Sequence, residues 1–542
     1  MEPDLLVHRG RVFDGETLTP ATAVAVSGGV VVAVGSDEEA AAAVAPGATR
    51  IDAGGGLIGP GFLDSHVHPP QGGRERLTCD LTDATDARTT LDMVARYAAD
   101  HPDAEWIVGG GWHMPHFEGG LPRAELLEQI APGRNIYLVN ADHHGAWVSP
   151  AALAAAGIDR DFPDPADGHI DRDAQGVPTG TLQEGAMELY EHLLPVPTEQ
   201  EWVDALIEAE RYLRSFGITG WQDAIVGGYA GVPDVTDAYL RGFDSGVLSG
   251  RVTAALWLPR GFAVGDVEEV VARLVAQRER IGLRTNEAGG TFRATTVKIM
   301  QDGVPESLTA ALKQPYLDAH GHPTDRTGPS HFPPEVLDAA AVALAREGFQ
   351  LHIHAIGDRA IAEAPIAKLR HHLAHLQQVD LADLGTMASL GVTANLQALW
   401  ACNSDQMTEL NLPLVGEERF SQQYPFASMV RAGIPLAMGS DWPVSTPDPW
   451  QAIHVAVNRT EPGETRYPPL GQGEELQLVQ ALSAYTSGSA RVTHHDDAGR
   501  IRVGLRADLA VADRDPFSIP VDEIATVRNT LTVSAGRVVA TA

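Results

Sequence analysis

Two histidines in the stretch GFLDSHVHPP, residues 61–70, have a spacing that suits metal binding. In an extended strand the side-chain period is two, so His66 and His68 point to one side while Val67 points to the other. Neutral imidazole is a common ligand for zinc and similar ions, and two from one strand begin a metal site. An isolated pair is equally compatible with hydrogen-bonded surface histidines, so the interpretation depends on the rest of the chain.

Further metal-competent side chains lie near the carboxyl ends of other apolar runs. They are Lys298 in TTVKIMQDG, His352 and His354 in FQLHIHAIGD, His375 in LRHHLAHLQ and Asp441 in IPLAMGSDWP. In a parallel barrel the carboxyl ends of the strands open onto one face, which is where catalytic residues collect. The pattern therefore predicts one site assembled from segments that are far apart in the sequence.

The runs that must position these residues alternate with helical segments. Strand-like stretches such as RVTAALWL and GVTANLQA lie near helical ones such as EEVVARLVAQRERIG and PEVLDAAAVALAREG. This alternation is typical of a parallel α/β architecture, which we place at residues 59–490. That span is longer than a bare barrel needs, so we expect an insertion at about residues 70–200.

Both ends of the chain have the pattern of β structure. Residues 1–58 and 491–542 consist mainly of short apolar runs separated by Gly, Asp and Pro. In LTPATAVAVSGGVVVAVGS two such runs meet at Gly28 and Gly29, which predicts two strands joined by a tight turn. The simplest arrangement pairs the two ends in one small β domain beside the barrel.

Composition excludes several classes of partner. The 542 residues include 39 Lys and Arg against 72 Asp and Glu, a formal charge of -33 that repels phosphate backbones and anionic membranes. We therefore expect neither a nucleic acid nor a membrane partner. Cys79 and Cys402 have no disulfide or zinc spacing, and no run is apolar enough for a leader or a membrane span, so we expect a cytoplasmic protein.

Taken together, the motifs resemble the amidohydrolase superfamily, and specifically its YtcJ-like branch, the amidohydrolase 3 family. GPGFLDSHVH, HAIGDRA, GSDWPV and GLRADLAVAD are similar to that branch's strand 1, strand 5, strand 8 and terminal β-domain motifs. GGGWHMPHFEGGLPRAELLEQIAP and DHHGAWVSPAALAAAGI resemble its insertion. The likeness covers nearly the whole chain, and motifs that occur jointly and in order are more specific than any single one. It implies a distorted (β/α)8 TIM barrel with a small β-sandwich domain formed from both chain ends.

The resemblance implies a set of metal ligands at the strand ends. They are His66, His68, His354 and His375, with Asp441 at the last strand. His354 is preferred over His352 because it directly precedes AIGDRA.

The position of His375 departs from the family pattern. The family's strand 6 histidine usually follows a glutamate, and here Ala374 stands in that place. His371 and His372 are therefore the alternatives to His375, although we expect both on a helix before the strand.

Lys298 needs separate treatment, because an ammonium group cannot bind a cation. In an apolar, metal-rich pocket the pKa of a lysine falls, which favours the neutral amine. The family precedent is reaction with carbon dioxide to give a carbamate that bridges two metal ions, so the resemblance implies a carboxylated Lys298. The alternative is an ion pair between Lys298 and Asp302 across a turn.

Asp441 is the predicted general acid/base. A carboxylate beside a metal-bound water takes its proton and passes it to a leaving group, as amide hydrolysis requires. The alternative is that Asp441 caps the following segment.

Several residues of the insertion are candidates for the wall of the substrate pocket. They are Trp112, His113, His143, His144 and Trp147. For each of them, ordinary packing or a structural hydrogen bond is an equal alternative.

We expect a metal-dependent hydrolase that cleaves the C–N bond of a small-molecule amide or N-acyl compound by attack of metal-activated water. The resemblance to the YtcJ-like branch makes an N-substituted formamide the expected substrate. The expected cofactor is one or two divalent ions, and zinc is the first choice. Neither a GxSxG elbow nor a Walker motif occurs. The alternatives are a deaminase or cyclic amide hydrolase using the same site, and a catalytically inactive metal-binding scaffold. The resemblance to the family also predicts a homodimer.

Overall fold

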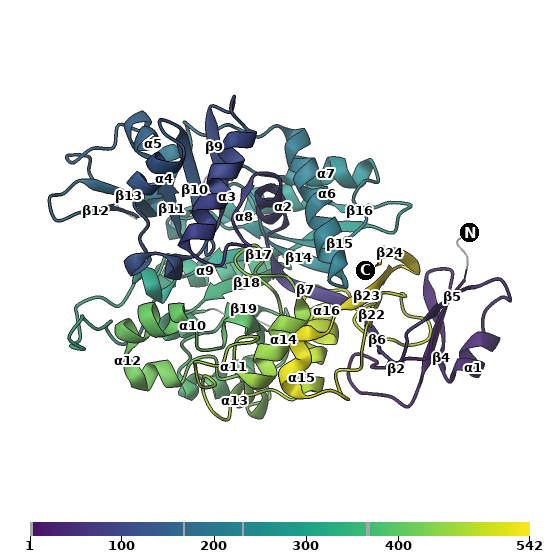
Figure 1. Ribbon diagram of the computed structural model, residues 1–542. Coiled ribbons are helices and arrows are strands. Elements are labelled where there is room, and N and C mark those ends of the chain that lie inside the picture. Colours follow the sequence, from purple (N-terminus) through teal and green to yellow (C-terminus); the bar gives the residue numbers. More distant parts are fainter. Residues whose placement is uncertain (1–3, 166–167, 230–231, 365–368, 542) are drawn as a thin grey trace.

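The computed structural model describes residues 4–165, 168–229, 232–364 and 369–541. Figure 1 shows a central barrel, with an insertion above it and a β domain beside it. Within the described residues, the barrel sheet has eight parallel strands in the order β21-β20-β19-β18-β17-β15-β14-β7. Their bounds are β7 Phe62–Val67, β14 Ile218–Val226, β15 Arg251–Trp257, β17 Thr291–Met300, β18 Gln350–Ala355, β19 His372–His375, β20 Thr393–Leu396 and β21 Leu436–Met438.

The first and last strands of this sheet close the barrel. The Ser65 hydroxyl in β7 donates to the Met438 carbonyl in β21 over 2.6 Å. Just beyond β21, the backbone N–H of Asp441 donates to the His66 carbonyl over 2.8 Å. A short strand, β16 (Leu283–Thr285), pairs antiparallel with β17 outside the barrel path. The expected distorted (β/α)8 barrel is confirmed.

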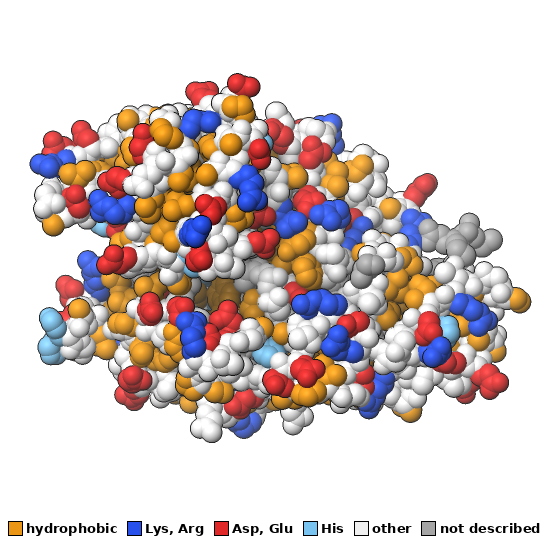
Figure 2. All heavy atoms as spheres, in the orientation of Figure 1, with side chains coloured by type: hydrophobic (Ala, Val, Ile, Leu, Met, Phe, Trp, Pro, Cys, Tyr) orange, Lys and Arg blue, Asp and Glu red, His pale blue; other side chains and the backbone are white. Residues whose placement is uncertain are grey.

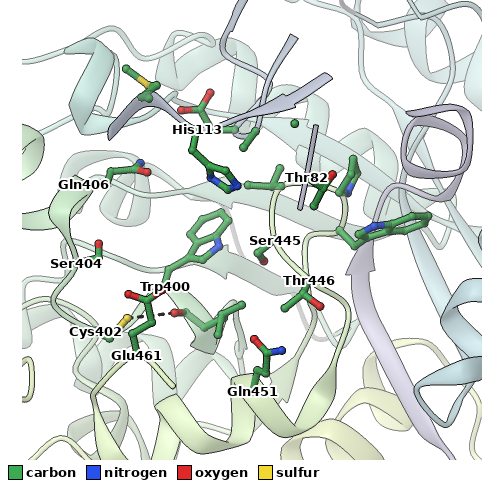
Figure 3. Close-up of a pocket in the computed structure, with 18 of the residues that line it drawn as sticks. Thr82, His113, Trp400, Cys402, Ser404, Gln406, Ser445, Thr446, Gln451 and Glu461 are labelled. Carbon is green, nitrogen blue, oxygen red and sulfur yellow. Dashed lines mark hydrogen bonds between the residues drawn. The ribbon is translucent and has the colours of Figure 1, made fainter. Parts of the chain in front are cut away.

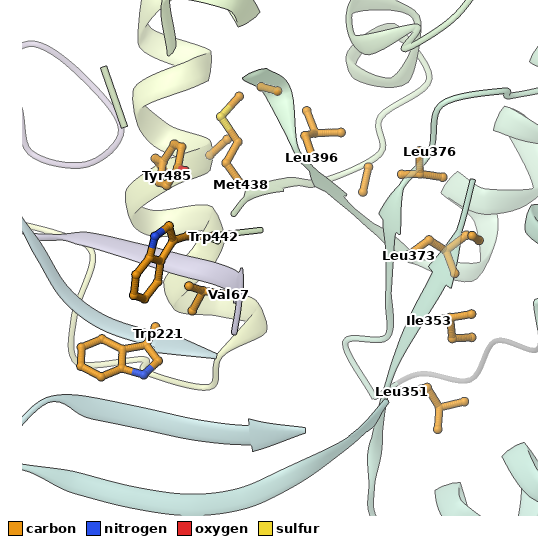
Figure 4. Packing of buried hydrophobic residues seen from close by; sticks show 14 of the residues in the cluster. Val67, Trp221, Leu351, Ile353, Leu373, Leu376, Leu396, Met438, Trp442 and Tyr485 are labelled. Carbon is orange, nitrogen blue, oxygen red and sulfur yellow. The ribbon is translucent and has the colours of Figure 1, made fainter. Parts of the chain in front are cut away.

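The barrel strands are apolar on the side that the helices cover. Every residue of β14 and β18 is buried, as expected for parallel strands covered on both faces. Figure 4 shows Leu351, Ile353 and Leu373 among the packed hydrophobic side chains. Because the side-chain period of a strand is two, His352 and His354 point to the opposite side, into the barrel.

Helices surround the barrel, and two of them are the stretches EEVVARLVAQRERIG and PEVLDAAAVALAREG that the sequence predicts as helical. The helices are α2 Pro69–Leu77, α6 Glu199–Ser215, α7 Thr236–Asp244, α8 Val267–Ile281, α9 Pro334–Arg346, α10 Asp358–Glu363, α11 Leu384–Leu390, α12 Leu412–Ser421, α13 Phe426–Arg431, α14 Pro449–Asn458, α15 Leu478–Ser483 and α16 Ser489–Val492. One expectation is wrong: His372 begins strand β19, and His371 directly precedes it, rather than both lying on a helix. Burial explains the difference, because both side chains are enclosed by the barrel wall.

The insertion has a sheet of its own, in the order β12-β13-β11-β10-β9-β8. The strands are β8 Cys79–Asp80, β9 Trp106–Trp112, β10 Asn135–Asn140, β11 Gly145–Val148, β12 Gly168–Arg172 and β13 Pro178–Glu184. Three helices accompany them: α3 Ala87–Asp100, α4 Ala124–Ile130 and α5 Pro150–Ala155. The loop between β10 and β11 and the end of β13 approach the barrel at the carboxyl ends of its strands.

Two sheets form the β domain, one from the N-terminal end alone and one from both chain ends. One has the order β4-β3-β1-β5 and the other β2-β6-β22-β23-β24. The strands are β1 Leu5–His8, β2 Arg11–Val12, β3 Ala23–Ser27, β4 Val30–Gly35, β5 Thr49–Asp52, β6 Leu57–Pro60, β22 Leu509–Ala512, β23 Asn529–Ser534 and β24 Arg537–Thr541, with helix α1 at Asp37–Ala42. Strands β3 and β4 flank the turn predicted at Gly28 and Gly29. The expected β domain from both ends is confirmed, whereas the domain limits 1–58, 59–490 and 491–542 stay predictions.

A buried arginine joins the barrel to the β domain. Arg251, at the start of β15, lies 3.5 Å from Asp508 and also contacts Asp497. Asp508 belongs to the closing motif GLRADLAVAD, just before β22.

Across the described residues, no helix has the length and apolar character needed to cross a membrane. Cys79 and Cys402 are buried and free. The cytoplasmic location stays a prediction.

Candidate metal centre

One small pocket at the carboxyl ends of the barrel strands collects the predicted ligands. Its volume is about 80 Å³, and its lining includes His66, His68, Lys298, His354, His375 and Asp441. These side chains come from β7 and the residue after it, from β17, β18 and β19, and from the turn after β21. The parallel strands thus bring together residues that the sequence separates widely.

The most compact part of the pocket is formed by His66, His68 and Asp441. The Oδ1 atom of Asp441 lies 3.3 Å from Nε2 of His66 and 3.0 Å from Nε2 of His68. One donor atom from each residue lies within 4.8 Å of the other two. Burial opposes the charge on Asp441, but the two imidazoles hold the pKa of this carboxyl well below its usual range. The arrangement presents two nitrogens and a carboxylate to one point.

His66 is held in place by a second histidine inside the barrel. Nδ1 of His66 lies 2.9 Å from Nε2 of His352, so the other ring nitrogen of His66 faces Asp441. Burial, with Lys298 nearby, lowers the pKa of His66 to about 3. His66 is therefore a neutral imidazole, which is the form that binds metals.

His354 has a carboxylate partner on the side away from the pocket. Its Nδ1 lies 3.0 Å from Oδ1 of Asp302, which also accepts the backbone N–H of Ile356. A ligand histidine usually donates its second N–H to such a group, which fixes the ring orientation. Nε2 of His354 is thus the nitrogen available for a metal.

His375 ends strand β19 in a left-handed backbone conformation, with φ of 78°. Its ring stacks on the Trp400 indole, with centroids 5.1 Å apart and an interplanar angle of 2°. Nδ1 lies 3.9 Å from Oδ2 of Asp441. Neither ring nitrogen has a hydrogen-bond partner among the described residues, although both are buried.

Lys298 is 1% exposed and points toward the same group of histidines. Its Nζ atom lies 3.4 Å from Nε2 of His66. Burial lowers the pKa of Lys298 to about 8, against the opposing effect of Asp441 and Asp223. Asp302, the alternative partner considered from the sequence, instead accepts hydrogen bonds from His354 and from backbone N–H groups.

The donor atoms fit a divalent ion of the zinc type. Imidazole nitrogens and carboxylate oxygens are ligands that zinc accepts. Buried polar atoms that lack a hydrogen-bond partner are costly, and several of the pocket's donors are in that position within the described chain. They are Nδ1 and Nε2 of His375 and Oδ1 of Asp441. A bound cation would satisfy these atoms.

A larger cleft of about 590 Å³ adjoins the small pocket. The two cavities share lining residues, among them Asp142, Val304, Trp400 and Val444. Figure 2 shows the surface hollowed between the insertion and the barrel. In Figure 3, His113 from the insertion and Trp400 from the barrel face each other across this cleft.

A protein-family comparison bears on this arrangement. The model described as the amidohydrolase family matches residues 49–540. The chain belongs to the amidohydrolase family.

Three relatives match along nearly the full length of the chain. The chain is 29% identical to the protein YtcJ of Bacillus subtilis, covering 95% of each chain. It is 28% identical to the protein LONG AFTER FAR-RED 3 of Arabidopsis thaliana, covering 94% of this chain and 87% of the relative. It is 26% identical to the N-substituted formamide deformylase of Arthrobacter pascens, covering 93% of this chain and 92% of the relative.

Solved structures share the fold of this amidohydrolase. An uncharacterized metal-dependent hydrolase from Pyrococcus horikoshii superposes with a TM-score of 0.72 at 23% identity, covering 96% of this chain and 99% of that one. A second uncharacterized metal-dependent hydrolase, from Pyrococcus furiosus, superposes with a TM-score of 0.70 at 23% identity. The match covers 95% of this chain and 100% of that one.

The insertion of this amidohydrolase supplies part of the pocket lining. His143 and His144 line the small pocket, and His113 lines the larger cleft. Trp112 differs from expectation: it is 1% exposed and its indole N–H donates to the Leu138 carbonyl within the insertion core. Trp147 is likewise enclosed there, in contact with Trp112. These two indoles stabilise the insertion rather than line either cavity.

Several residues around the site were missed by the sequence analysis. They are Glu75, Glu184 and Trp400, of which the first two pair with His143 and His144. His352 and Asp302 were named from the sequence, but their pairing with His66 and His354 was not predicted. Glu75 and Glu184 carried no signal, since surface helices and strand ends commonly contain glutamate.

Proposed function

We propose that this amidohydrolase is a metal-dependent enzyme that hydrolyses the C–N bond of a small-molecule amide. The observation that carries the proposal is the convergence of two imidazole Nε2 atoms on Oδ1 of Asp441, at 3.3 and 3.0 Å. A carboxylate beside metal ligands serves both as a ligand and as a proton acceptor. The site therefore contains the two functions that amide hydrolysis by water requires.

We assign the metal to the side chains of the small pocket. His66, His68 and Asp441 would hold one ion, and Lys298, His354 and His375 extend the donor set on the adjoining side. Zinc is the metal we propose, because it accepts this mixture of nitrogen and oxygen ligands. When bound, it supplies Lewis-acid activation of the carbonyl and of water. A carboxylated Lys298 would contribute two further oxygens.

Asp441 moves the proton in this proposal. Its Oδ1 atom faces His66 and His68, so Oδ2 is the oxygen available for transfer. Oδ2 accepts a proton from the attacking water as the new C–O bond forms. It then returns that proton to the nitrogen as the C–N bond breaks, which gives a carboxylic acid and an amine.

The two cavities support a substrate with a small acyl group and a larger amine part. The pocket at the strand ends has a volume of about 80 Å³, against about 590 Å³ for the cleft beside it. A formyl group is the smallest acyl group. This division supports an N-substituted formamide, the substrate class in the name of the Arthrobacter pascens relative.

The proposal is tested by removing and restoring the metal. Protein treated with a chelator is assayed on a panel of N-substituted formamides and other amides, before and after addition of zinc, with amine and acid release as the readout. We expect hydrolysis only after zinc is restored. Full turnover by protein shown to be metal-free by elemental analysis would contradict the proposal.

Two variants link the metal to the site. His68→Ala should lower both the bound zinc and the rate, whereas His101→Ala, at an exposed position on the insertion, should change neither. Release of ammonia as the nitrogen product would identify a deaminase instead. No turnover on the whole panel by zinc-loaded protein would identify a binding scaffold.

A further inference from the structure

A histidine and a glutamate from the insertion form a pair at the edge of the small pocket. His144 lies in the loop between β10 and β11, and Glu184 is the last residue of β13. Nδ1 of His144 lies 3.0 Å from Oε1 of Glu184. The backbone N–H of Glu184 also donates to the His144 carbonyl over 3.0 Å. Both the side chains and the backbone therefore hold the two residues together.

The pair is also tied to the barrel. The Thr309 hydroxyl, in the segment after β17, donates to Oε1 of Glu184 over 3.2 Å. Glu184 has a φ of 50°, a region that non-glycine residues rarely occupy. Such a conformation has an energetic cost and persists only where the surroundings enforce it, most often at functional sites. The carboxylate of Glu184 is thus placed with precision at the junction of insertion and barrel.

The ring of His144 has one nitrogen engaged and one available. Nδ1 faces Glu184, which leaves Nε2 as the ring nitrogen that is not engaged in this pair. The side chain stays 13% exposed, and His144 lines the same small pocket as Lys298 and Asp441. The Nε2–H group is therefore a donor that a ligand in this pocket can reach.

Charge strengthens this donor. Burial opposes the protonation of His144, but the Glu184 carboxylate outweighs it and raises the pKa of His144 to about 9. Burial likewise opposes the charge on Glu184, yet the imidazolium lowers the pKa of that carboxyl to about 2. Other charged or titratable groups that interact with the pair include Asp142, Tyr229, Arg260, Glu306, His331 and His354.

We propose that His144 is a catalytic residue whose Nε2–H donates a hydrogen bond to the substrate oxygen that becomes negatively charged during hydrolysis, with Glu184 as its positioning residue. The inference rests on the proposed function. Preorganised donors aimed at developing charge are effective in a buried pocket, because they need no reorganisation during the reaction. A cationic imidazole that shares the pocket with Asp441 meets this requirement.

The experiment is a pH profile of kcat/KM for zinc-loaded wild type, Glu184→Gln and His144→Gln. In the wild type we expect activity to fall as the pH rises through about 9, where His144 loses its proton. Glu184→Gln should move this basic limb toward His144's ordinary pKa of 6.5. His144→Gln, which keeps a neutral donor, should lose that limb, and His144→Ala should lower kcat by about 10²-fold to 10³-fold.

A matched control uses another pair on the insertion. His169 and Asp164 lie 2.8 Å apart on the surface, so Asp164→Asn should leave the pH profile of the wild type unchanged. NMR of isotope-labelled histidine in the metal-free protein gives a readout that does not depend on activity. The His144 ring should titrate near pH 9 in the wild type and at lower pH in Glu184→Gln.

The failure of this inference differs from the failure of the proposed function. Metal-dependent hydrolysis with a basic limb that does not move in Glu184→Gln overturns the role of the pair and leaves the hydrolase in place. Retention of wild-type kcat by folded His144→Ala has the same consequence. No hydrolysis by zinc-loaded wild type overturns the proposed function, and this inference with it.

Discussion

Nε2 of His68 lies 3.0 Å from Oδ1 of Asp441, although His68 follows the first strand of the barrel and Asp441 follows the last. Barrel closure creates this contact, since the backbone N–H of Asp441 donates to the His66 carbonyl over 2.8 Å. Asp441 also has a φ of 57°, which non-glycine residues rarely adopt. The site is thus completed at the seam of the barrel.

Asp441→Asn should lower kcat by about 10²-fold to 10⁴-fold, because the amide cannot accept the proton from water. The variant keeps nearly the same shape, so bound zinc should fall little while the histidines remain. Steady-state kinetics and elemental analysis on folded protein check both expectations. Asp513→Asn, in the β domain, is the control. Wild-type turnover by zinc-loaded Asp441→Asn would assign the proton transfer to another group, with His375 as the next to test.

Lys298→Ala should reduce the zinc content if Lys298 carries a carbamate. Added acetate should then partly restore activity, because it supplies the missing oxygens. The Lys298→Arg variant should stay inactive when acetate is added, since a guanidinium stays charged and forms no carbamate. Lys313→Ala, which removes a surface lysine paired with Asp380, is the control. An unmodified lysine by mass spectrometry, with normal zinc in Lys298→Ala, would leave Lys298 a structural role.

Arg251→Met should lower the free energy of unfolding by about 3 kcal/mol, because it leaves a buried carboxylate without one of its partners. Asp508, that carboxylate, is enclosed between the barrel and the β domain and keeps Arg506 and the backbone N–H of Ala535 as partners. Chemical denaturation measures the change. The control is Arg241→Met, which removes an exposed pair with Glu199 and should cost at most about 1 kcal/mol. Equal losses of unfolding free energy in Arg251→Met and Arg241→Met would contradict a stabilising role for the buried pair of Arg251 and Asp508.

The pair of His144 and Glu184 should make stability depend on pH. The pKa of His144 is raised from 6.5 to about 9, so its contribution is complete below pH 6.5 and is lost as the pH rises through about 9. The pKa of Glu184 is lowered from 4.5 to about 2, so its contribution is complete above pH 4.5 and is lost as the pH falls through about 2. Both contributions are therefore complete between pH 4.5 and 6.5.

Glu184→Gln should consequently be less stable than the wild type by about 1.5–3 kcal/mol in that range, the value of a hydrogen bond to a charged group. The difference should shrink above pH 9. Denaturation curves for both proteins across the pH range measure it. A difference that is constant with pH would show that the pair is not ionised.

The sequence by itself determined the barrel and the residues at its strand ends. Strand and helix periodicities are local properties, and the carboxyl ends of parallel strands share one face, so His66, His354 and Asp441 were placed on that face before any contact was known. The β domain followed from the same kind of pattern at the two ends. Local spacing was sufficient for the strands, the helices and the faces of their side chains, because each depends on the backbone of one segment. The barrel and the two-ended β domain rested on the family resemblance as well.

Only the tertiary structure decided which groups are partners. Asp302 was considered as the partner of Lys298, yet it accepts a hydrogen bond from His354. Glu184 gave no signal in the sequence and lies 3.0 Å from His144. Trp112, expected at the substrate pocket, is enclosed in the insertion core instead. The physical reason is that hydrogen-bond partners and burial depend on how separate segments pack, and burial then shifts the pKa values that decide which groups are charged.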